Sequence, residues 1–342
     1  MSKKQWIWLI VAVIVFAVAG TASVAVNTWS RRTVSDAVTT SVTDLYAGAF
    51  SGGDSITPEF PAEPFVARLD IEGTIVSEGS PAGMMAGSGF DLEYILDYID
   101  RLMECDTNQG ILLYVNSGGG EMGASDEVYL KLMDYKAATG RPIYAYFDGT
   151  ACSGAYYIAM AADEIWANRN CICVNIGVYI STYNLKGLFD KYGVEEIMIR
   201  SSENKGIGSM GQEWTEEQLA IYQSIVDLYY DQFLEVVSAG RGMPKDTVKA
   251  LDDGREMLAI QALEKGFVDG IGRWEEYRDQ VLGYFGEDVP LYSEEPSEMD
   301  MFTQLLQNIY GRLEALTPRS EAEILKSLMD QPEGIVVMAY AG

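Results

Sequence analysis

Short apolar segments that alternate with helical segments constrain the fold of this chain more than any other feature. Gly110–Val115 is a continuous apolar run, which is typical of a strand buried on both faces of a sheet. Three further segments predict strands from their apolar and β-branched content: Phe65–Val76, Ile143–Phe147 and Glu164–Ala167. The sequence therefore predicts a sheet with Gly110–Val115 in its interior.

Helices are predicted between these strands. Apolar residues recur at helical spacing from Leu92 to Leu102, and further helices are predicted at about 125–138 and from Ser153 onward. Strands that alternate with helices pair in parallel, so the predicted fold class is α/β with a parallel sheet. In such folds ligands gather at the carboxyl ends of strands, and we expect functional groups after Val115 and Phe147.

The N-terminal segment Trp6–Val26 carries no charged side chain and is long enough to cross a bilayer, which takes about 20 residues. Two lysines precede it, as the positive-inside rule favours for a cytoplasmic end. We therefore predict a transmembrane anchor at residues 6–28 in the cell membrane, with the remainder of the chain on the extracytoplasmic side. A cleaved signal peptide is the alternative, since Ala17-Val18-Ala19 has the small-residue cleavage pattern.

Composition divides the rest of the chain. Residues 1–5 remain as a cytoplasmic N-terminus, and residues 29–64, rich in Ser, Thr, Gly and Pro, predict a linker. Residues 65–285 contain the strand and helix pattern and predict one domain. Residues 286–342 predict a C-terminal extension with an acidic lead-in, an amphipathic helix whose apolar stripe runs from Met301 to Leu316, and an apolar tail.

The chain contains no histidine, so a nucleophilic serine would need a lysine or a carboxylate as its base. Asp and Glu number 51 against 24 Lys and Arg, which argues against nucleic acid as a partner. Cys171 and Cys173 lie two positions apart, but zinc sites usually need a second such pair or histidines, and the chain offers only the separate Cys105 and Cys152 besides. We expect no metal and no cofactor, and we expect this cysteine pair to be buried at the end of a strand.

Two motifs fall at the expected ends of strands. Asn116-Ser117-Gly118-Gly119-Gly120 predicts a turn whose free amides could stabilise an oxyanion, with Gly119 and Gly120 as candidate donors. Ser153 stands among small residues at a helix start, where Gly154 could supply a further amide. Each motif alone has a plainer interpretation, a connecting turn for the first and a helix N-cap for Ser153, but the pair is more specific.

These residues resemble the signal peptide peptidase A group of membrane-anchored Ser-Lys proteases, within the Clp protease and crotonase-like superfamily. The resemblance rests on Asn116–Gly120, on the serine motif Cys152–Tyr157, and on Gly254-Arg255 with the later stretch Ala262–Asp269. It implies repeated β-β-α units around a parallel sheet, one N-terminal transmembrane helix and a helical C-terminal extension. The motifs cover roughly residues 65–272 in the family's order.

The resemblance also implies the roles of individual residues. Ser153 is the expected nucleophile, and Lys205, about fifty residues on, is the expected base. A lysine must be desolvated to accept a proton at neutral pH. Asn175 stands where the family places a serine or threonine that orients the lysine, and Gly118 stands where proline is usual. The implied activity is serine endopeptidase cleavage of remnant signal peptides or other membrane-associated polypeptides by a homo-oligomeric ring.

The tail Gly334–Gly342 is too apolar for a typical disordered end, and we expect it to dock as a strand. One hypothesis places this strand in the active-site groove as a self-inhibitory peptide, and the alternative is a plain edge strand.

Other functions stay open. A catalytically inactive membrane scaffold or peptide-binding protein is the main alternative, because Asn175 and Gly118 are both unusual. A crotonase-like acyl-CoA enzyme would share the fold, and a stomatin-cleaving membrane protease would share the Ser-Lys pair. Cys152 is a minor rival for the role of nucleophile.

Overall fold

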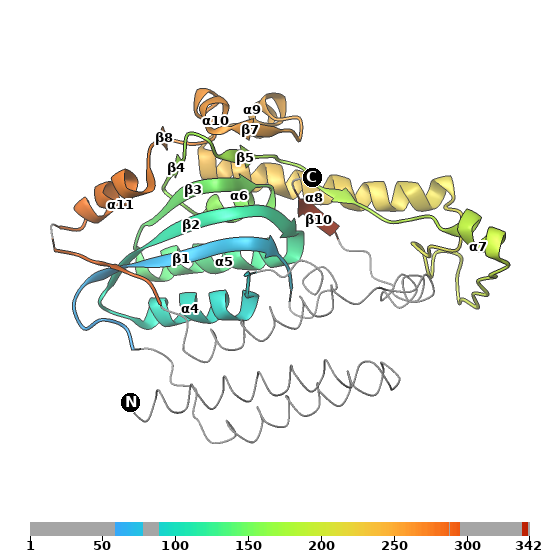
Figure 1. The fold of residues 1–342 in the computed structure, drawn as a ribbon, viewed down its shortest axis with the longest axis horizontal. Helices are drawn as coiled ribbons and strands as arrows, with labels where there is room; N and C mark the ends of the chain where they lie inside the picture. The colour runs from blue at the N-terminus through green and yellow to red at the C-terminus, as the bar shows by residue number, and fades with distance from the viewer. Residues whose placement is uncertain (1–58, 78–88, 287, 295–336, 341–342) are drawn as a thin grey trace, which may run out of the picture. The chain divides into compact units, whose positions relative to one another are not determined.

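The centre of the structure is a mostly parallel β-sheet, shown in the computed structural model of Figure 1. The structure describes residues 59–77, 89–286, 288–294 and 337–340. Five strands pair in parallel in the spatial order β1 (Phe65–Ile75), β2 (Asn108–Glu121), β3 (Ile143–Cys152), β4 (Glu164–Ala167) and β8 (Gly270–Ile271). This arrangement confirms the predicted α/β fold with a parallel sheet.

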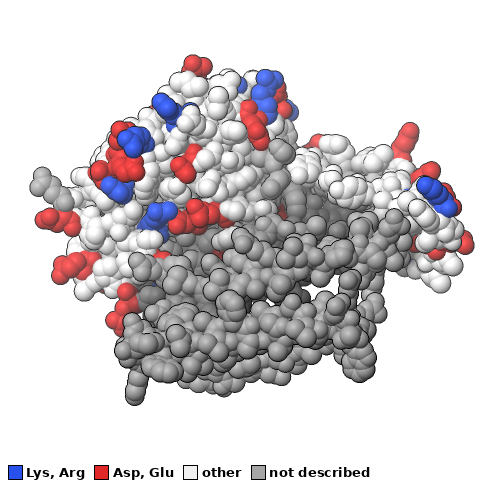
Figure 2. Space-filling model, viewed as in Figure 1, with Lys and Arg blue, Asp and Glu red and all other residues white. Residues whose placement is uncertain are grey.

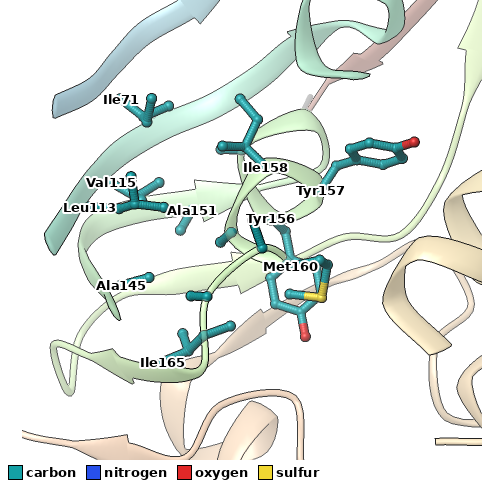
Figure 3. Packing of buried hydrophobic residues seen from close by; sticks show 14 of the residues in the cluster. Ile71, Leu113, Val115, Ala145, Ala151, Tyr156, Tyr157, Ile158, Met160 and Ile165 are labelled. Atoms are coloured by element: carbon teal, nitrogen blue, oxygen red, sulfur yellow. The ribbon is translucent and has the colours of Figure 1, made fainter. Parts of the chain in front are cut away.

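The two faces of the sheet bury different side chains, because successive residues of a strand point to opposite faces. Val66, Leu112 and Tyr146 pack on one face against α11 (Trp274–Gly283). The other face forms the larger core, where side chains of β1, β2 and β3 meet those of a short helix after β3 (Figure 3). Burial on both faces explains why β2 has a continuous apolar sequence.

Helices of the main core cover the second face. They are α4 (Leu92–Glu104), α5 (Met122–Thr139), α6 (Gly154–Ala159) and α8 (Glu216–Arg241). Asp91 starts α4 by accepting a hydrogen bond from Tyr94 N–H at 3.0 Å, and Gly140 ends α5 in the left-handed conformation that favours glycine. Among them, α6 follows the carboxyl end of β3 and packs in the main core.

A smaller layer extends β3 beyond its contact with β4. β5 (Ile172–Val174) pairs in parallel with the end of β3, and β7 (Glu256–Leu258) pairs antiparallel with β5. Helices α9 (Lys245–Leu251) and α10 (Ala259–Glu264) flank β7 in the chain. Cys171 and Cys173 are buried here, as the sequence predicted.

Ordered contacts continue on both sides of the predicted domain at 65–285. Phe60, within the predicted linker, stacks on Phe65 with ring centroids 5.6 Å apart. After residue 285, β9 (Leu291–Tyr292) pairs with β1, and Glu294 forms an ion pair with Arg101 at 2.8 Å. The peptide segments next to the domain therefore contribute to its core.

Residues 181–215, which we term the arm, project from the body of the fold between β6 (Tyr179–Ile180) and α8 (Figure 1). The arm contains α7 (Lys186–Tyr192) and is held by its own contacts, such as Leu185 N–H to Met210 O at 2.7 Å. Tyr222, on α8, donates to Ile207 O at 3.2 Å. The arm thus rests on the first turns of α8.

The predicted anchor at residues 6–28, most of the linker and the helix at 301–316 lie outside the described residues. Within the described ranges, no helix combines the length and apolar character that crossing a bilayer requires.

Candidate active site

The glycine-rich motif after Val115 is strand, not the predicted turn. β2 continues to Glu121, and α5 begins at the next residue. The neighbouring strand determines this, because Ile75 of β1 pairs with Gly120, and a Cβ on Gly120 would lie 1.9 Å from Ile75 O. Only glycine permits so close an approach of two backbones. Gly120 therefore serves the contact with β1, and its other edge faces away from β1.

Ser153 stands at the junction of β3 and α6 in a strained conformation, with φ 54° and ψ −118°. A positive φ at a residue with a Cβ costs about 1–3 kcal/mol and concentrates at functional sites. Ser153 occupies the N-cap position of α6, as the plainer interpretation predicted, but its hydroxyl makes no cap bond to the helix. Its Oγ is buried and has no hydrogen-bond partner among the described residues. Backbone hydrogen bonds therefore fix the position of this serine, while its hydroxyl makes no hydrogen bond to the described residues.

The amides predicted to hold an oxyanion differ in their surroundings. Gly119 N–H already donates to Ser117 Oγ at 3.1 Å, and that hydroxyl donates to Gly73 O at 2.6 Å. Gly120 lies beside the start of α6, since a Cβ on Gly154 would be 3.2 Å from Gly120 N. Gly154 is the first residue of α6, where an N–H has no partner inside the helix. Gly120 and Gly154 are thus the pair that the structure brings together.

The two tyrosines of the serine motif anchor α6. Tyr156 donates to Phe267 O at 2.8 Å, and Tyr157 donates to Asp126 Oδ1 at 2.6 Å while accepting from Gln232 at 3.0 Å. Both rings are buried in the main core (Figure 3). These bonds fix α6, and with it Ser153, to α5, α8 and the turn before β8.

Asn175 follows β5 and lies beside the nucleophile, because Val174 pairs with Cys152. Val174 and Asn175 both have positive φ, 75° and 55°. The Asn175 amide Nδ2 donates to Gly254 O at 3.1 Å, an arrangement that leaves the amide oxygen as an acceptor. The predicted lysine-orienting residue is therefore close to Ser153.

Asp252 is a further residue of this region, which the sequence motifs do not predict. Its buried carboxylate accepts from the backbone of Ile176 and of Gly254. Burial raises the pKa of the Asp252 carboxyl, against the effect of its two backbone donors and of Lys265. The available signal was its position two residues before Gly254, a spacing at which an aspartate commonly caps a turn.

Lys205 is exposed on the arm, whereas Ser153 Oγ is buried and makes no hydrogen bond to it or to any other described residue. The backbone N–H of Lys205 donates to Ser202 O at 3.2 Å within a run of turns. A lysine base requires desolvated surroundings, and this exposed position does not provide them.

Cys152, the rival nucleophile, is fully buried at the end of β3. Its thiol donates to Ile172 O at 3.5 Å, and burial raises the pKa of the Cys152 thiol well above its ordinary range. A thiol that stays protonated is a poor nucleophile, so the structure favours Ser153 over its neighbour.

The C-terminal tail docks as a strand, as predicted, on the edge of the glycine motif that faces away from β1. β10 (Val337–Tyr340) pairs antiparallel with Gly119–Glu121 of β2 and with β6. At these residues β1 pairs with one edge of β2. β3 pairs with the opposite edge only as far as Ser117, which lies opposite Ala151, and β10 pairs with the part of that edge beyond Ser117. Tyr340 lies opposite Gly119, so the tail runs toward the Ser153 end of the edge.

Two family models match the chain. Peptidase family S49 matches residues 136–281, and Clp protease matches residues 92–172. Both matches include Ser153.

Relatives of known name extend over more of the chain. One from Enterococcus faecium, named "Putative signal peptide peptidase SppA", is 30% identical over 82% of this chain and 81% of its own length. A "Putative protease" from Synechocystis is 32% identical over 65% of this chain and 75% of its own. Protease 4 from Haemophilus influenzae is 29% identical over 62% of this chain but only 33% of its own.

Proposed function

This chain belongs to peptidase family S49 and is by that relationship a serine-type peptidase, and we propose that it is a membrane-anchored endopeptidase with Ser153 as nucleophile and Lys205 as base. The observation that carries the proposal is the strained Ser153, whose buried Oγ has no partner among the described residues. The N–H of Gly154 follows it directly in the chain, and the backbone nitrogen of Gly120 lies beside Gly154. This combination suits attack on a carbonyl carbon better than a structural role.

The proposed reaction has two stages. Ser153 Oγ attacks the peptide carbonyl and gives its proton to Lys205, while the N–H groups of Gly120 and Gly154 donate to the oxyanion. The lysine returns the proton to the departing amine, and the acyl group remains on the serine. Water then attacks the ester with Lys205 again as base, which releases the acid product and restores the hydroxyl.

Lys205 has to reach Ser153 from the exposed arm, and we propose that assembly of a homo-oligomeric ring brings it there from a neighbouring copy. Apolar side chains on the arm support this, since Ile197 is 79% exposed and Ile199 is 97% exposed. In Figure 2 most of the charged side chains of the projection that the arm and α8 form lie near its far end, away from the body. Docking this surface on a second copy would bury it and remove water from Lys205, as a base requires.

The proposed substrates are extended peptides that pair as a strand with Gly119–Glu121 of β2, in the place that β10 takes in this structure. β10 is antiparallel to β2 there and runs toward Ser153. A substrate bound in this way would place its acyl side along Gly119–Glu121 and its scissile carbonyl near the nucleophile. With the anchor at residues 6–28 in the bilayer, remnant signal peptides and other membrane-associated polypeptides are the polypeptides it would meet. The pairing of β10 also supports self-inhibition by the tail.

The test uses the full-length protein in detergent with fluorogenic apolar peptides. We compare wild type with Ser153→Ala and Lys205→Ala, and Lys191→Ala on the same arm is the matched control. The two site variants are expected to be inactive and the control active. Mixing the two inactive variants is expected to restore part of the activity, because some interfaces then combine an intact serine with an intact lysine.

The outcomes separate the alternatives. An assembled wild type that neither cleaves peptides nor reacts with a fluorophosphonate would overturn the peptidase in favour of the scaffold. Activity of Lys205→Ala equal to wild type would remove Lys205 as base. Inactive variants that fail to complement on mixing would show that one chain supplies both residues.

A further inference from the structure

A buried carboxylate links two distant segments next to the nucleophile. Asp252 is 2% exposed, and its Oδ1 accepts from Gly254 N–H at 2.6 Å while its Oδ2 accepts from Ile176 N–H at 3.2 Å. Gly254 belongs to the turn between α9 and β7, and Ile176 follows β5. Asp252 therefore ties this turn to the segment that leaves β5.

The segment that Asp252 holds is strained. Val174 and Asn175 are consecutive residues with positive φ, and a β-branched residue such as valine is rarely found there. Such conformations persist only where the surrounding contacts determine them. Asn175 Nδ2 adds a bond to Gly254 O at 3.1 Å, so the same turn holds the strained pair through both the side chain of Asn175 and the backbone of the next residue.

The strained segment in turn holds the nucleophile. Val174 O accepts the N–H of Ser153 at 2.7 Å, the last backbone contact before α6 begins. Ser153 needs such support because its own φ is 54°. A continuous chain of hydrogen bonds and backbone therefore runs from Asp252 through Ile176 and Val174 to Ser153.

We propose that Asp252 is a positioning residue of the active site, which keeps Ser153 in its attacking conformation through the Val174–Asn175 segment. The inference rests on the proposed peptidase function and names a residue whose carboxylate acts without touching substrate. Both donors that face it are N–H groups, so both of its oxygens must be acceptors. An amide of the same shape would turn an NH₂ group toward one of these N–H donors and lose that bond.

The experiment compares Asp252→Asn with Asp253→Asn in the full-length protein. Asp253 is the matched control, since it is adjacent in the chain but exposed and paired with Arg255 at the surface. We measure kcat and KM for an apolar peptide, the rate of fluorophosphonate labelling at Ser153, and the unfolding temperature. Misplacement of a reacting group by about 1 Å lowers rates about 10²-fold. Asp252→Asn is thus expected to lower kcat and the labelling rate by a similar factor at nearly unchanged KM, and Asp253→Asn to leave both unchanged.

Wild-type kcat and labelling in a folded Asp252→Asn would overturn the inference and leave the peptidase intact. An unreactive wild type would overturn the proposed function and this inference with it. If Asp252→Asn does not fold, Asp252→Glu keeps both acceptors but moves them by one methylene. That variant is expected to fold with a reduced labelling rate, and a labelling rate equal to wild type would refute the positioning role.

Discussion

Replacing Gly120 by alanine tests whether contact between β1 and β2 shapes the active-site edge. The added Cβ would lie 1.9 Å from Ile75 O and 2.7 Å from both Ile75 C and Ile75 N. All three atoms belong to the backbone, so no side-chain rotation relieves the clash and β1 must move away from β2. Overpacking of this kind costs about 1–3 kcal/mol.

Gly123→Ala is the matched control, because it adds the same methyl group three residues later in α5. A Cβ there meets nothing within 4 Å, and alanine is the better helix former by about 0.5–1 kcal/mol. The two variants should therefore change stability in opposite directions.

Thermal unfolding measures the difference. In a domain of this size 1 kcal/mol shifts the unfolding temperature by about 2–4 °C, so Gly120→Ala is expected to lower it by about 2–12 °C. The same movement displaces the Gly120 amide, and the fluorophosphonate labelling rate should fall together with stability. An unfolding temperature and labelling rate equal to wild type in Gly120→Ala would refute the reasoning.

The tail and the cysteines provide the remaining tests. Truncation after Gln331 is expected to raise the initial peptidase rate about twofold or more if β10 covers the edge of β2 in half of the copies or more. Unchanged rate and oligomer size would exclude self-inhibition. Iodoacetamide at pH 8 is expected to modify the half-buried Cys105 and to spare Cys152, whose burial keeps the thiol protonated. Peptide mapping of the alkylated native protein decides this, and rapid modification of Cys152 would contradict it.

The sequence predicts the central strands well because their signal is local. Gly110–Val115 must be apolar throughout to lie between two covered faces, and β4 is found at the predicted residues 164–167. The short strands β7 and β8 have no comparable signal. Two or three residues form a strand there only because a partner strand is already present, which a single sequence does not reveal.

The glycine motif shows how a local preference can mislead. Three consecutive glycines favour a turn, yet Gly120 is extended because Ile75 approaches it from forty-five positions away. Asp252 escaped notice for a similar reason. The role proposed for it depends on its hydrogen bond from Ile176, a residue far away in the sequence, and a single sequence does not reveal which aspartate the fold will bury beside such a donor.

Ser153 and Lys205 differ in how they are held, and this difference bears on how activity would be controlled. Ser153, the proposed nucleophile, is fixed within one chain by β3, by α6 and by the Val174 carbonyl, so its geometry is complete before any partner arrives. Lys205, the proposed base, lies on an exposed arm that packs on itself and on α8. A preorganised nucleophile without its base reacts slowly with a peptide, because the serine proton has no acceptor. If the ring supplies the lysine, dilution below the assembly concentration should abolish peptide cleavage while each chain keeps its fold. For a chain anchored as proposed, proteolysis would then be confined to membrane regions where several copies meet.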